Sequence, residues 1–192
     1  MSVQWAGGRL AAAMRADAAR NLDAVLHAGA RLLARDPATA MAAIAAEAGV
    51  DRRTVCRRFA NREALLAAVY AAKLDASGAV LDAARLTEAP VAIARHGYVE
   101  SIIPVGRRRP LDIRRMREVD PEADERAEAQ RERLEAFLPR AADEGLIRQD
   151  LLPGWAKALL GGMIDNMVHV FTDIEPGPAV DPVVISFGDG VG

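Results

Sequence analysis

The sequence predicts an all-α protein of 192 residues, and three observations favour helices. Hydrophobic residues make up 51% of the chain but aromatic residues only 4%, so its apolar content is mostly small and aliphatic. Alanine-rich stretches of this kind have a high helix propensity. Apolar residues also recur at helical spacing, and prolines and glycines divide the chain into helix-sized segments. Only residues 180–187 have a strand-like composition, over a short stretch.

The first predicted helix covers residues 15–35. Asp36-Pro37 ends it, because a proline keeps the residue before it out of the helical region. The apolar residues repeat every three or four positions and so share one face. They are Leu22, Val25, Leu26, Gly29, Leu32 and Leu33.

Two short helices joined by a tight turn follow, from residue 41 to 48 and from Asp51 to Phe59. Gly49 tolerates the positive φ that ends the first of them. The carboxylate of Asp51 can accept from free backbone N–H groups and so cap the second, and Asn61 can cap the helix that follows. Val55 and Phe59 lie at i and i+4 and point inward together. This spacing indicates a helix-turn-helix.

Arginines crowd the outer face of the second helix and the start of the next one. Like charges in this arrangement repel unless an anion is near. Guanidinium groups fit phosphate and the guanine edge bidentately, and this helix is the one that the motif presents to the major groove. We therefore expect double-stranded DNA as the partner, whereas a merely solvated charged face is the simpler alternative. The five arginines are Arg52, Arg53, Arg57, Arg58 and Arg62.

In these segments the chain resembles the TetR-type (tetracycline-repressor-like) transcriptional regulators. The resemblance covers residues 15–75 and includes IAAEAGV and RRTVCRRFANREALLAAVY. It implies an all-helical homodimer whose N-terminal three-helix unit binds a palindromic operator. It also implies a C-terminal helical bundle that binds a small-molecule inducer.

Two positions depart from the family pattern. Cys56 stands where the family usually has a tyrosine that contacts a phosphate, and a thiol reaches and donates less well. Either the neighbouring arginines compensate or operator affinity is lower. Cys56 as a redox sensor is the alternative, since nearby arginines lower the pKa of a thiol. Ala40 aligns where the family often has Ser or Thr, with Thr39 one residue earlier.

We expect residues 1–62 to form the DNA-binding domain and residues 63–192 the ligand-binding and dimerisation domain. The charges agree, because residues 1–74 carry a net charge of +5 and the remainder −7. A basic end suits docking on a polyanion. Base contacts are assigned to Arg52, Arg53 and Thr54, and phosphate contacts to Arg57, Arg58, Arg62 and Thr39.

The remaining helices are bounded by proline and glycine. A helix from Arg62 to Leu86 connects the domains, and a second covers residues 90–103 before Pro104 and Gly106 break it. A basic loop at 107–109 and a short helix at 111–118 follow. A charged helix then opens at Pro121 and ends at Gly145, with a kink or break at Pro139. The last two segments are an apolar helix opening at Pro153 and, as the resemblance implies, a short final helix that Pro182 permits.

The helix from Trp155 to Phe171 is apolar on more than one face, so it needs two packing partners. Its paired glycines are unfavourable in a helix unless another helix approaches closely. We expect a four-helix dimer interface across a two-fold axis, with ordinary core packing as the alternative. The interface residues assigned are Leu160, Gly161, Ile164 and Val168. An apolar inducer site is assigned to Leu111, Met116, Phe137, Met163, Met167 and Phe171.

Other chemistry is not indicated. None of the three histidines has metal-ligand spacing, and no catalytic motif or phosphate loop occurs, so no metal, cofactor or enzymatic activity is expected. The single cysteine favours a reducing compartment, and no signal peptide or uninterrupted membrane span is evident, so a cytoplasmic protein is expected. The alternatives to an inducible repressor are a constitutive DNA-binding protein and a small-molecule-binding protein whose arginine helix holds an anionic ligand.

Overall fold

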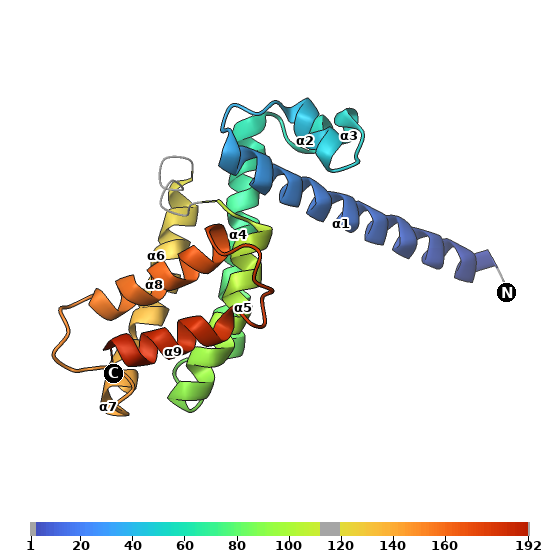
Figure 1. Ribbon diagram of the computed structural model, residues 1–192. Coiled ribbons are helices and arrows are strands. Elements are labelled where there is room, and N and C mark those ends of the chain that lie inside the picture. Colours follow the sequence, from blue (N-terminus) through green and yellow to red (C-terminus); the bar gives the residue numbers. More distant parts are fainter. Residues whose placement is uncertain (1–2, 112–119, 192) are drawn as a thin grey trace. The chain divides into compact units, whose positions relative to one another are not determined.

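The computed structural model describes residues 3–111 and 120–191, and over these ranges the chain is all-α, as predicted (Figure 1). No strand occurs in either range. The helices are, in chain order, α1 (Val3–Arg35), α2 (Met41–Glu47), α3 (Arg52–Arg58), α4 (Arg62–Ala84), α5 (Val91–Arg108), α6 (Pro121–Glu135), α7 (Phe137–Asp143), α8 (Trp155–His169) and α9 (Val180–Val191).

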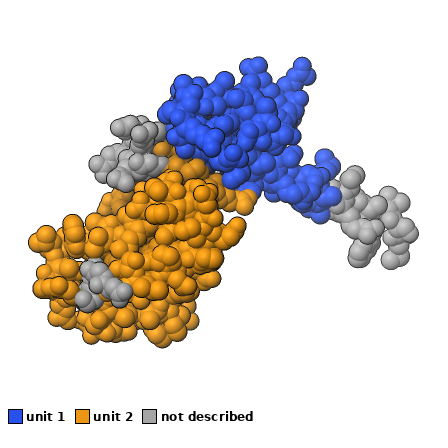
Figure 2. All heavy atoms as spheres, in the orientation of Figure 1, with its two compact units in different colours: residues 1–69 blue, residues 70–192 orange. Residues whose placement is uncertain are grey.

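The chain divides into two compact units, Met1–Val69 and Tyr70–Gly192 (Figure 2). The division falls inside α4, so this helix supplies its first two turns to unit 1 and the rest to unit 2. The domain boundary expected from the sequence, 62/63, stands at the first residue of the same helix.

Unit 1 is a three-helix arrangement closed by the start of α4. α1 packs on α2, and α2 on α3. Gly29 of α1 lies where a β-carbon would come within 3.3 Å of Val69, so its lack of a side chain permits close approach to α4. Ile44, Val55 and Leu65 are buried between the helices. These contacts form the core of a helix-turn-helix unit.

The predicted start of the first helix, Arg15, is wrong: α1 begins at Val3. The segment before Arg15 contains a run of alanines and no proline. Helix propensity therefore carries α1 towards the N-terminus, beyond the positions where apolar periodicity reveals it.

By length and mean hydropathy alone, α4 could cross a membrane. In the structure it serves as a core helix, because Leu65, Val69 and Leu74 along it are fully buried against other helices.

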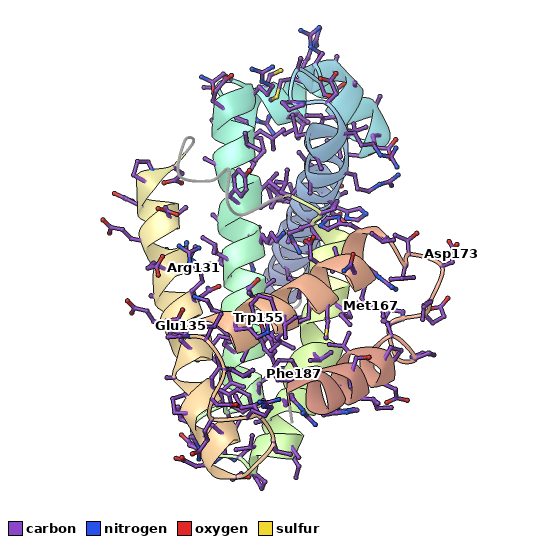
Figure 3. All side chains as sticks on the ribbon, turned by 60° about the vertical axis from the view of Figure 1, so that its left-hand side comes forward. Arg131, Glu135, Trp155, Met167, Asp173 and Phe187 are labelled. Atoms are coloured by element: carbon purple, nitrogen blue, oxygen red, sulfur yellow. The ribbon has the colours of Figure 1, made fainter. Side chains whose placement is uncertain are left out.

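Unit 2 is a helical bundle arranged around α5. This helix packs against α8, α9 and α7, while α8 also packs on α9. One continuous apolar core joins them and includes Phe137 of α7, together with Met167 of α8 and Phe187 of α9, which Figure 3 labels. α5 is therefore the element on which the unit is assembled.

The predicted helix break at Pro104 and Gly106 is wrong, because α5 continues through both residues to Arg108. The predicted basic loop is accordingly helical at Arg107 and Arg108. The predicted helix at 111–118 falls, apart from Leu111, outside the described residues. Tertiary contacts of α5 with α8, at Arg107 and Gly106, outweigh the local cost of Pro104.

Arg107 holds the end of α8. Its Nε and Nη2 donate to Met167 O at 3.1 and 2.9 Å, Nη2 also donates to Phe171 O at 2.9 Å, and Nη1 donates to Ile174 O at 2.6 Å. The last carbonyl groups of a helix have no partner within the helix and carry partial negative charge. Arg107 thus caps the C-terminus of α8 from α5.

Gly106, one residue earlier, is where α5 and α8 cross most tightly. A β-carbon at this position would lie 2.5 Å from Cγ2 and 3.1 Å from Cγ1 of Val168. Val168 is buried, and its branched side chain has little freedom to move away. Only glycine therefore fits at this crossing.

The other boundaries follow the sequence more closely. The charged helix does break, but at Ala136, three residues before Pro139, which lies in the first turn of α7 where a missing N–H costs little. α8 ends at His169, and residues 180–187 are helical in α9 despite their strand-like composition.

Arg95 of α5 is a buried charge. It is 9% exposed, and its Nε and Nη1 have no hydrogen-bond partner among the described residues. Burial lowers the pKa of its guanidinium. Burial of these two donors without acceptors costs stability, which the apolar contacts of α5 offset.

Substitutions of the two glycines of α5 test whether α5 and α8 cross tightly at Gly106. Gly106→Ala should lower the free energy of unfolding by about 1–3 kcal/mol, because the new methyl group displaces Val168. Gly97→Ala, on the same helix with nothing within 4 Å of its β-carbon, should raise it by about 0.5–1 kcal/mol. Urea unfolding followed by circular dichroism measures both. Equal effects of the two substitutions would contradict a tight crossing at Gly106.

Candidate DNA-binding surface and ligand cavity

The turn between α2 and α3 is fixed by backbone hydrogen bonds. Gly49 has φ of +64°, and its N–H donates to Ala46 O at 3.1 Å, while Val50 N donates to Ala45 O at 3.0 Å. These bonds close the C-terminus of α2 in the manner of a left-handed cap. The chain can then reverse within the four residues that separate α2 from α3.

Side chains cap the next two helices as the sequence predicts. Asp51 Oδ1 accepts from Arg53 N at 2.7 Å and begins α3, and Asn61 Oδ1 accepts from Ala64 N at 2.8 Å and begins α4. Ala40 precedes α2 without a side-chain cap. Neighbouring Thr39 is half-buried, and its hydroxyl donates to Asp36 O at 2.7 Å.

The outer face of α3 carries uncompensated positive charge. Arg52, Arg53, Arg57 and Arg58 are exposed, and none joins an ion pair within the described part of the chain. Arg62 differs, because it is half-buried and pairs with Glu63 at 2.9 Å. The pKa of Glu63 is lowered by backbone hydrogen bonding and by this arginine. Four guanidinium groups without an ion-pair partner on one short helix fit a polyanion.

The assigned contact residues do not all lie on the same side of α3. Thr54 is half-buried and, with Arg57 and Arg58, lines a groove between α3 and α1 whose opposite wall includes Asp17 and Asn21. Cys56 is exposed on α3. The structure thus brings together the arginines and Thr54 on one short helix, with Thr39 at the entry to α2.

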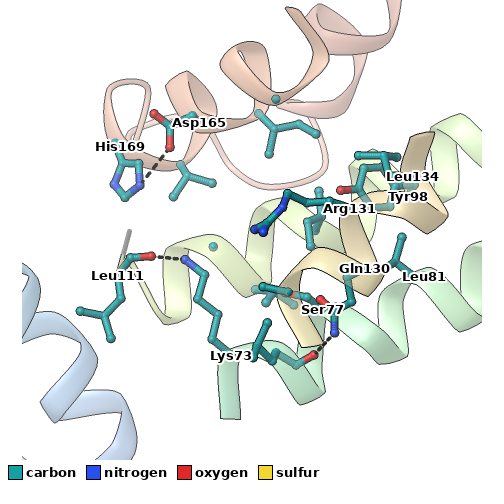
Figure 4. Close-up of a pocket in the computed structure, with 18 residues that line it drawn as sticks. Lys73, Ser77, Leu81, Tyr98, Leu111, Gln130, Arg131, Leu134, Asp165 and His169 are labelled. Carbon is teal, nitrogen blue, oxygen red and sulfur yellow. Dashed lines mark hydrogen bonds and ion pairs between the residues drawn. The ribbon is translucent and has the colours of Figure 1, made fainter. Parts of the chain in front are cut away.

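A cavity of about 320 Å³ lies within unit 2 (Figure 4). Its walls come from α4, α5, α6 and α8 and from Leu111, so segments far apart in sequence meet around it. Most of the lining is apolar. The polar side chains on its wall are Lys73, Ser77, Tyr98, Gln130, Arg131, Asp165 and His169.

Several of these polar side chains already form hydrogen bonds or an ion pair with neighbouring residues. Lys73 Nζ donates to Leu111 O, and Gln130 Nε2 donates to Leu74 O at 2.8 Å. His169 Nε2 lies 3.4 Å from Asp165 Oδ1 at the mouth. Burial raises the pKa of Tyr98 to about 12, so its hydroxyl stays protonated at neutral pH.

Only Leu111 of the residues assigned to an inducer site lines this cavity. Phe137, Met163 and Met167 pack into or against the core of unit 2, and Phe171 is half-exposed beyond the end of α8. Met116 falls outside the described residues. The assignment selected large apolar side chains, which in this bundle fill the core.

The residues assigned to a dimer interface have mixed surroundings in the single chain. Leu160 is buried in the core of its own chain, and Gly161, Ile164 and Val168 line the cavity. Gly161 is also exposed, beside an exposed stripe of α8 formed by Ala158, Gly162 and Asn166. The apolar pattern identified a helix with several packed faces, but not which neighbour each face meets.

Sequence reasoning missed the polar lining. Lys73 interrupts the apolar run at the start of α4, and Tyr98 is one of the chain's two tyrosines. A polar group on an apolar helical face is the signal that the sequence offers. No group of three or more potential metal ligands forms among the described side chains.

Comparisons with known proteins identify the family. Residues 25–69 match the model of the bacterial regulatory proteins, tetR family. The chain is 31% identical over 177 residues to the HTH-type transcriptional repressor LfrR of Mycolicibacterium smegmatis, covering 90% of each protein. The chain belongs to the TetR family. It is therefore a DNA-binding transcriptional regulator, as the helix-turn-helix indicates.

Solved structures of TetR-like regulators share the fold. LfrR of Mycobacterium smegmatis matches with a TM-score of 0.70 at 28% identity, covering 92% of this chain and 99% of that one. Its complex with proflavine matches with 0.67 at 29%, covering 90% and 98%. The TetR family regulator PfmR of Thermus thermophilus matches with 0.64 at 20%, covering 85% and 94%.

The Asp51 cap fixes the start of α3, the recognition helix of the helix-turn-helix. Asp51→Ala should destabilise the protein by about 1 kcal/mol and weaken DNA binding, because α3 loses its cap. Asp51→Ser keeps an acceptor oxygen and should stay close to the wild type in both respects. Thermal unfolding and gel shift measure the two effects, and a fully active Asp51→Ala protein would show that the cap does not order α3.

Proposed function

We propose that this TetR-family protein represses transcription at a palindromic operator and leaves it when a small molecule occupies the cavity of unit 2. The observation that carries the DNA step is the exposed face of α3, where Arg52, Arg53, Arg57 and Arg58 have no ion-pair partner among the described residues. A cytoplasmic location goes with this role, and we assign the protein no enzymatic activity.

In this proposal the N-terminal half of α3 enters the major groove. Arg52, Arg53 and Thr54 read base edges, and Arg57, Arg58 and Arg62 contact phosphates, with Thr39 assisting from the start of α2. On DNA binding, Arg62 would either leave Glu63 for a phosphate or contact both groups. Residues 1–62 thus act as the DNA-binding domain and residues 63–192 as the ligand-binding and dimerisation domain.

A palindrome requires two copies of α3 at successive major grooves, about 34–36 Å apart. We infer a homodimer formed through the exposed sides of α8 and α9. Ala158 and Gly162 leave α8 with a flat surface, on which nothing in the described chain lies within 4 Å of the Gly162 position, and Ile185 of α9 is 59% exposed. Small residues let helices of a second copy approach closely, and an exposed isoleucine gains from burial.

The cavity supports the inducible form of regulation over constitutive binding. α4 lines the cavity with Lys73, Ser77 and Leu81. It begins at Arg62, four residues after the end of α3, the helix proposed to enter the major groove. Occupancy that favours a different arrangement of α4 would lower operator affinity, with a coupling free energy of about 1–3 kcal/mol. LfrR, the relative, has been solved with proflavine bound.

Substitution of two arginines distinguishes contacts to bases from contacts to phosphates. Arg53→Ala should change which operator sequences bind, whereas Arg62→Ala should weaken all sequences and reduce the salt slope of log K by about 1. Gel shifts at several salt concentrations, with the native upstream DNA and scrambled duplexes, measure both. An Arg62→Ala protein with unchanged affinity and salt slope would overturn the phosphate assignment, and a wild type without duplex binding would overturn the function.

The dimer proposal is tested on the exposed isoleucines. Ile185→Glu should convert the dimer to a monomer and abolish tight operator binding, because a charge would be buried at the interface. Ile93→Glu, on α5 with 66% exposure, is the matched control and should remain dimeric. Sedimentation equilibrium at micromolar concentration measures the mass, and a monomeric wild type would contradict the proposal.

A further inference from the structure

We propose that the cavity of unit 2 binds an amphipathic organic acid whose carboxylate is held by Arg131 and whose apolar body lies against Leu81 and Leu134. This inference names the ligand class for the site, and it rests on the proposed function only in taking that ligand to be the inducer.

Arg131 has a donor edge left for a ligand. Its Nε donates to Glu128 Oε2 at 3.0 Å and its Nη2 bonds the same oxygen, while Asp124 Oδ1 lies 3.8 Å from Nη2. Within the described residues Nη1 makes no hydrogen bond. Glu128 and Asp124 are not among the residues that line the cavity, so they orient the guanidinium from outside. Figure 4 shows the group pointing into the cavity, between Lys73 and Asp165.

The inner wall favours a ligand that accepts hydrogen bonds. Arginine and lysine side chains have donors and no acceptor, and the Tyr98 hydroxyl remains protonated and able to donate. Lys73 is nine-tenths buried and adds positive charge to the wall, although its ammonium group already donates to Leu111 O. A carboxylate beside these groups would gain charge-assisted hydrogen bonds.

The same wall disfavours an organic cation. The one carboxylate among the described lining residues is Asp165, which is 61% exposed at the mouth and lies beside His169. Cations are held by the faces of Trp, Tyr and Phe, but Tyr98 is the only residue of these three types that lines the cavity in the described part of the chain. The cavity therefore lacks the features that would hold a planar cation such as the proflavine found with LfrR.

Shape and polarity fix the orientation of the acid. In Figure 4 Leu81, Leu134 and Tyr98 lie at the end of the cavity opposite Asp165, His169 and Leu111, with Arg131 between the two ends. An apolar chain fits the first end and a carboxylate the middle. A volume of about 320 Å³ lies at the lower end of the range of small-molecule pockets, which suits a medium-chain acid.

Three probes of equal chain length test the charge preference on the full-length protein. Isothermal titration calorimetry with decanoate, decanol and decylammonium should give the tightest binding for decanoate, at least 10-fold weaker binding for decanol and none for decylammonium. Decylammonium binding as tightly as decanoate, or no binding of decanoate at all, would overturn the proposal.

A matched pair of variants assigns the effect to Arg131. Arg131→Met should weaken decanoate binding at least 10-fold and leave decanol unchanged. Arg133→Met, on the same helix with an exposed ion pair to Asp82 at 2.7 Å, should bind both like the wild type. Arg131→Gln, which keeps a polar side chain, serves if Arg131→Met unfolds by circular dichroism, and unchanged decanoate affinity in either folded variant would overturn the assignment.

A gel shift of the wild type separates the two proposals. Decanoate should release the operator at concentrations that match its affinity. Duplex binding without any decanoate affinity would overturn the ligand class and leave the repressor function intact. Decanoate affinity without any duplex binding would overturn the repressor function and leave the ligand class intact.

Discussion

The crossing of α5 and α8 at Gly106 and Val168 is the contact on which unit 2 depends. It brings the two helices so close that a single methyl group would not fit, and Arg107 fixes the end of α8 from the next position along α5. Gly106 and Val168 also line the cavity. The position of its α8 wall is therefore set by backbone proximity and by hydrogen bonds to carbonyl groups, rather than by side chains that could adjust. This explains why α5 continues past Pro104 despite the lost hydrogen bond.

Unit 1 is organised on a different principle. Its core residues Ile44, Val55 and Leu65 hold short helices that would be marginal alone, and the Gly49 turn and the Asp51 cap determine where α3 begins. With its apolar side buried in the core, α3 presents mostly charged side chains outward. Repulsion among the arginines is the consequence, and it is relieved when a polyanion binds, so the same feature that weakens the isolated unit drives its association with DNA.

Local chemistry explains which parts of this structure could be predicted from sequence. The Gly49 turn, the caps at Asp51 and Asn61 and the inward pair Val55 and Phe59 depend on neighbours within four residues, and the structure confirms each of them. The path of α5 through Pro104 depends on α8, which lies far along the chain, and was predicted wrongly. The cavity lining depends on four helices at once. Residue type alone led to Phe137 and Met167, which fill the core, and away from Arg131 and Lys73, whose roles appear only when the bundle closes.

α8 shows how the proposed ligand and dimer functions can share one element. Successive positions on a helix turn by about 100°, so different positions of α8 have different surroundings. Leu160 and Met167 enter the core. A second stripe, Gly161, Asp165 and Val168, lines the cavity, and its first two residues are also exposed. A third stripe, Ala158, Gly162 and Asn166, is exposed and does not line the cavity. An acid bound at Arg131 would press on the second stripe, and a second copy of the chain would pack on the third. In this proposal a ligand that displaces α8 at the cavity also displaces the surface on which the partner packs, because both surfaces belong to one helix.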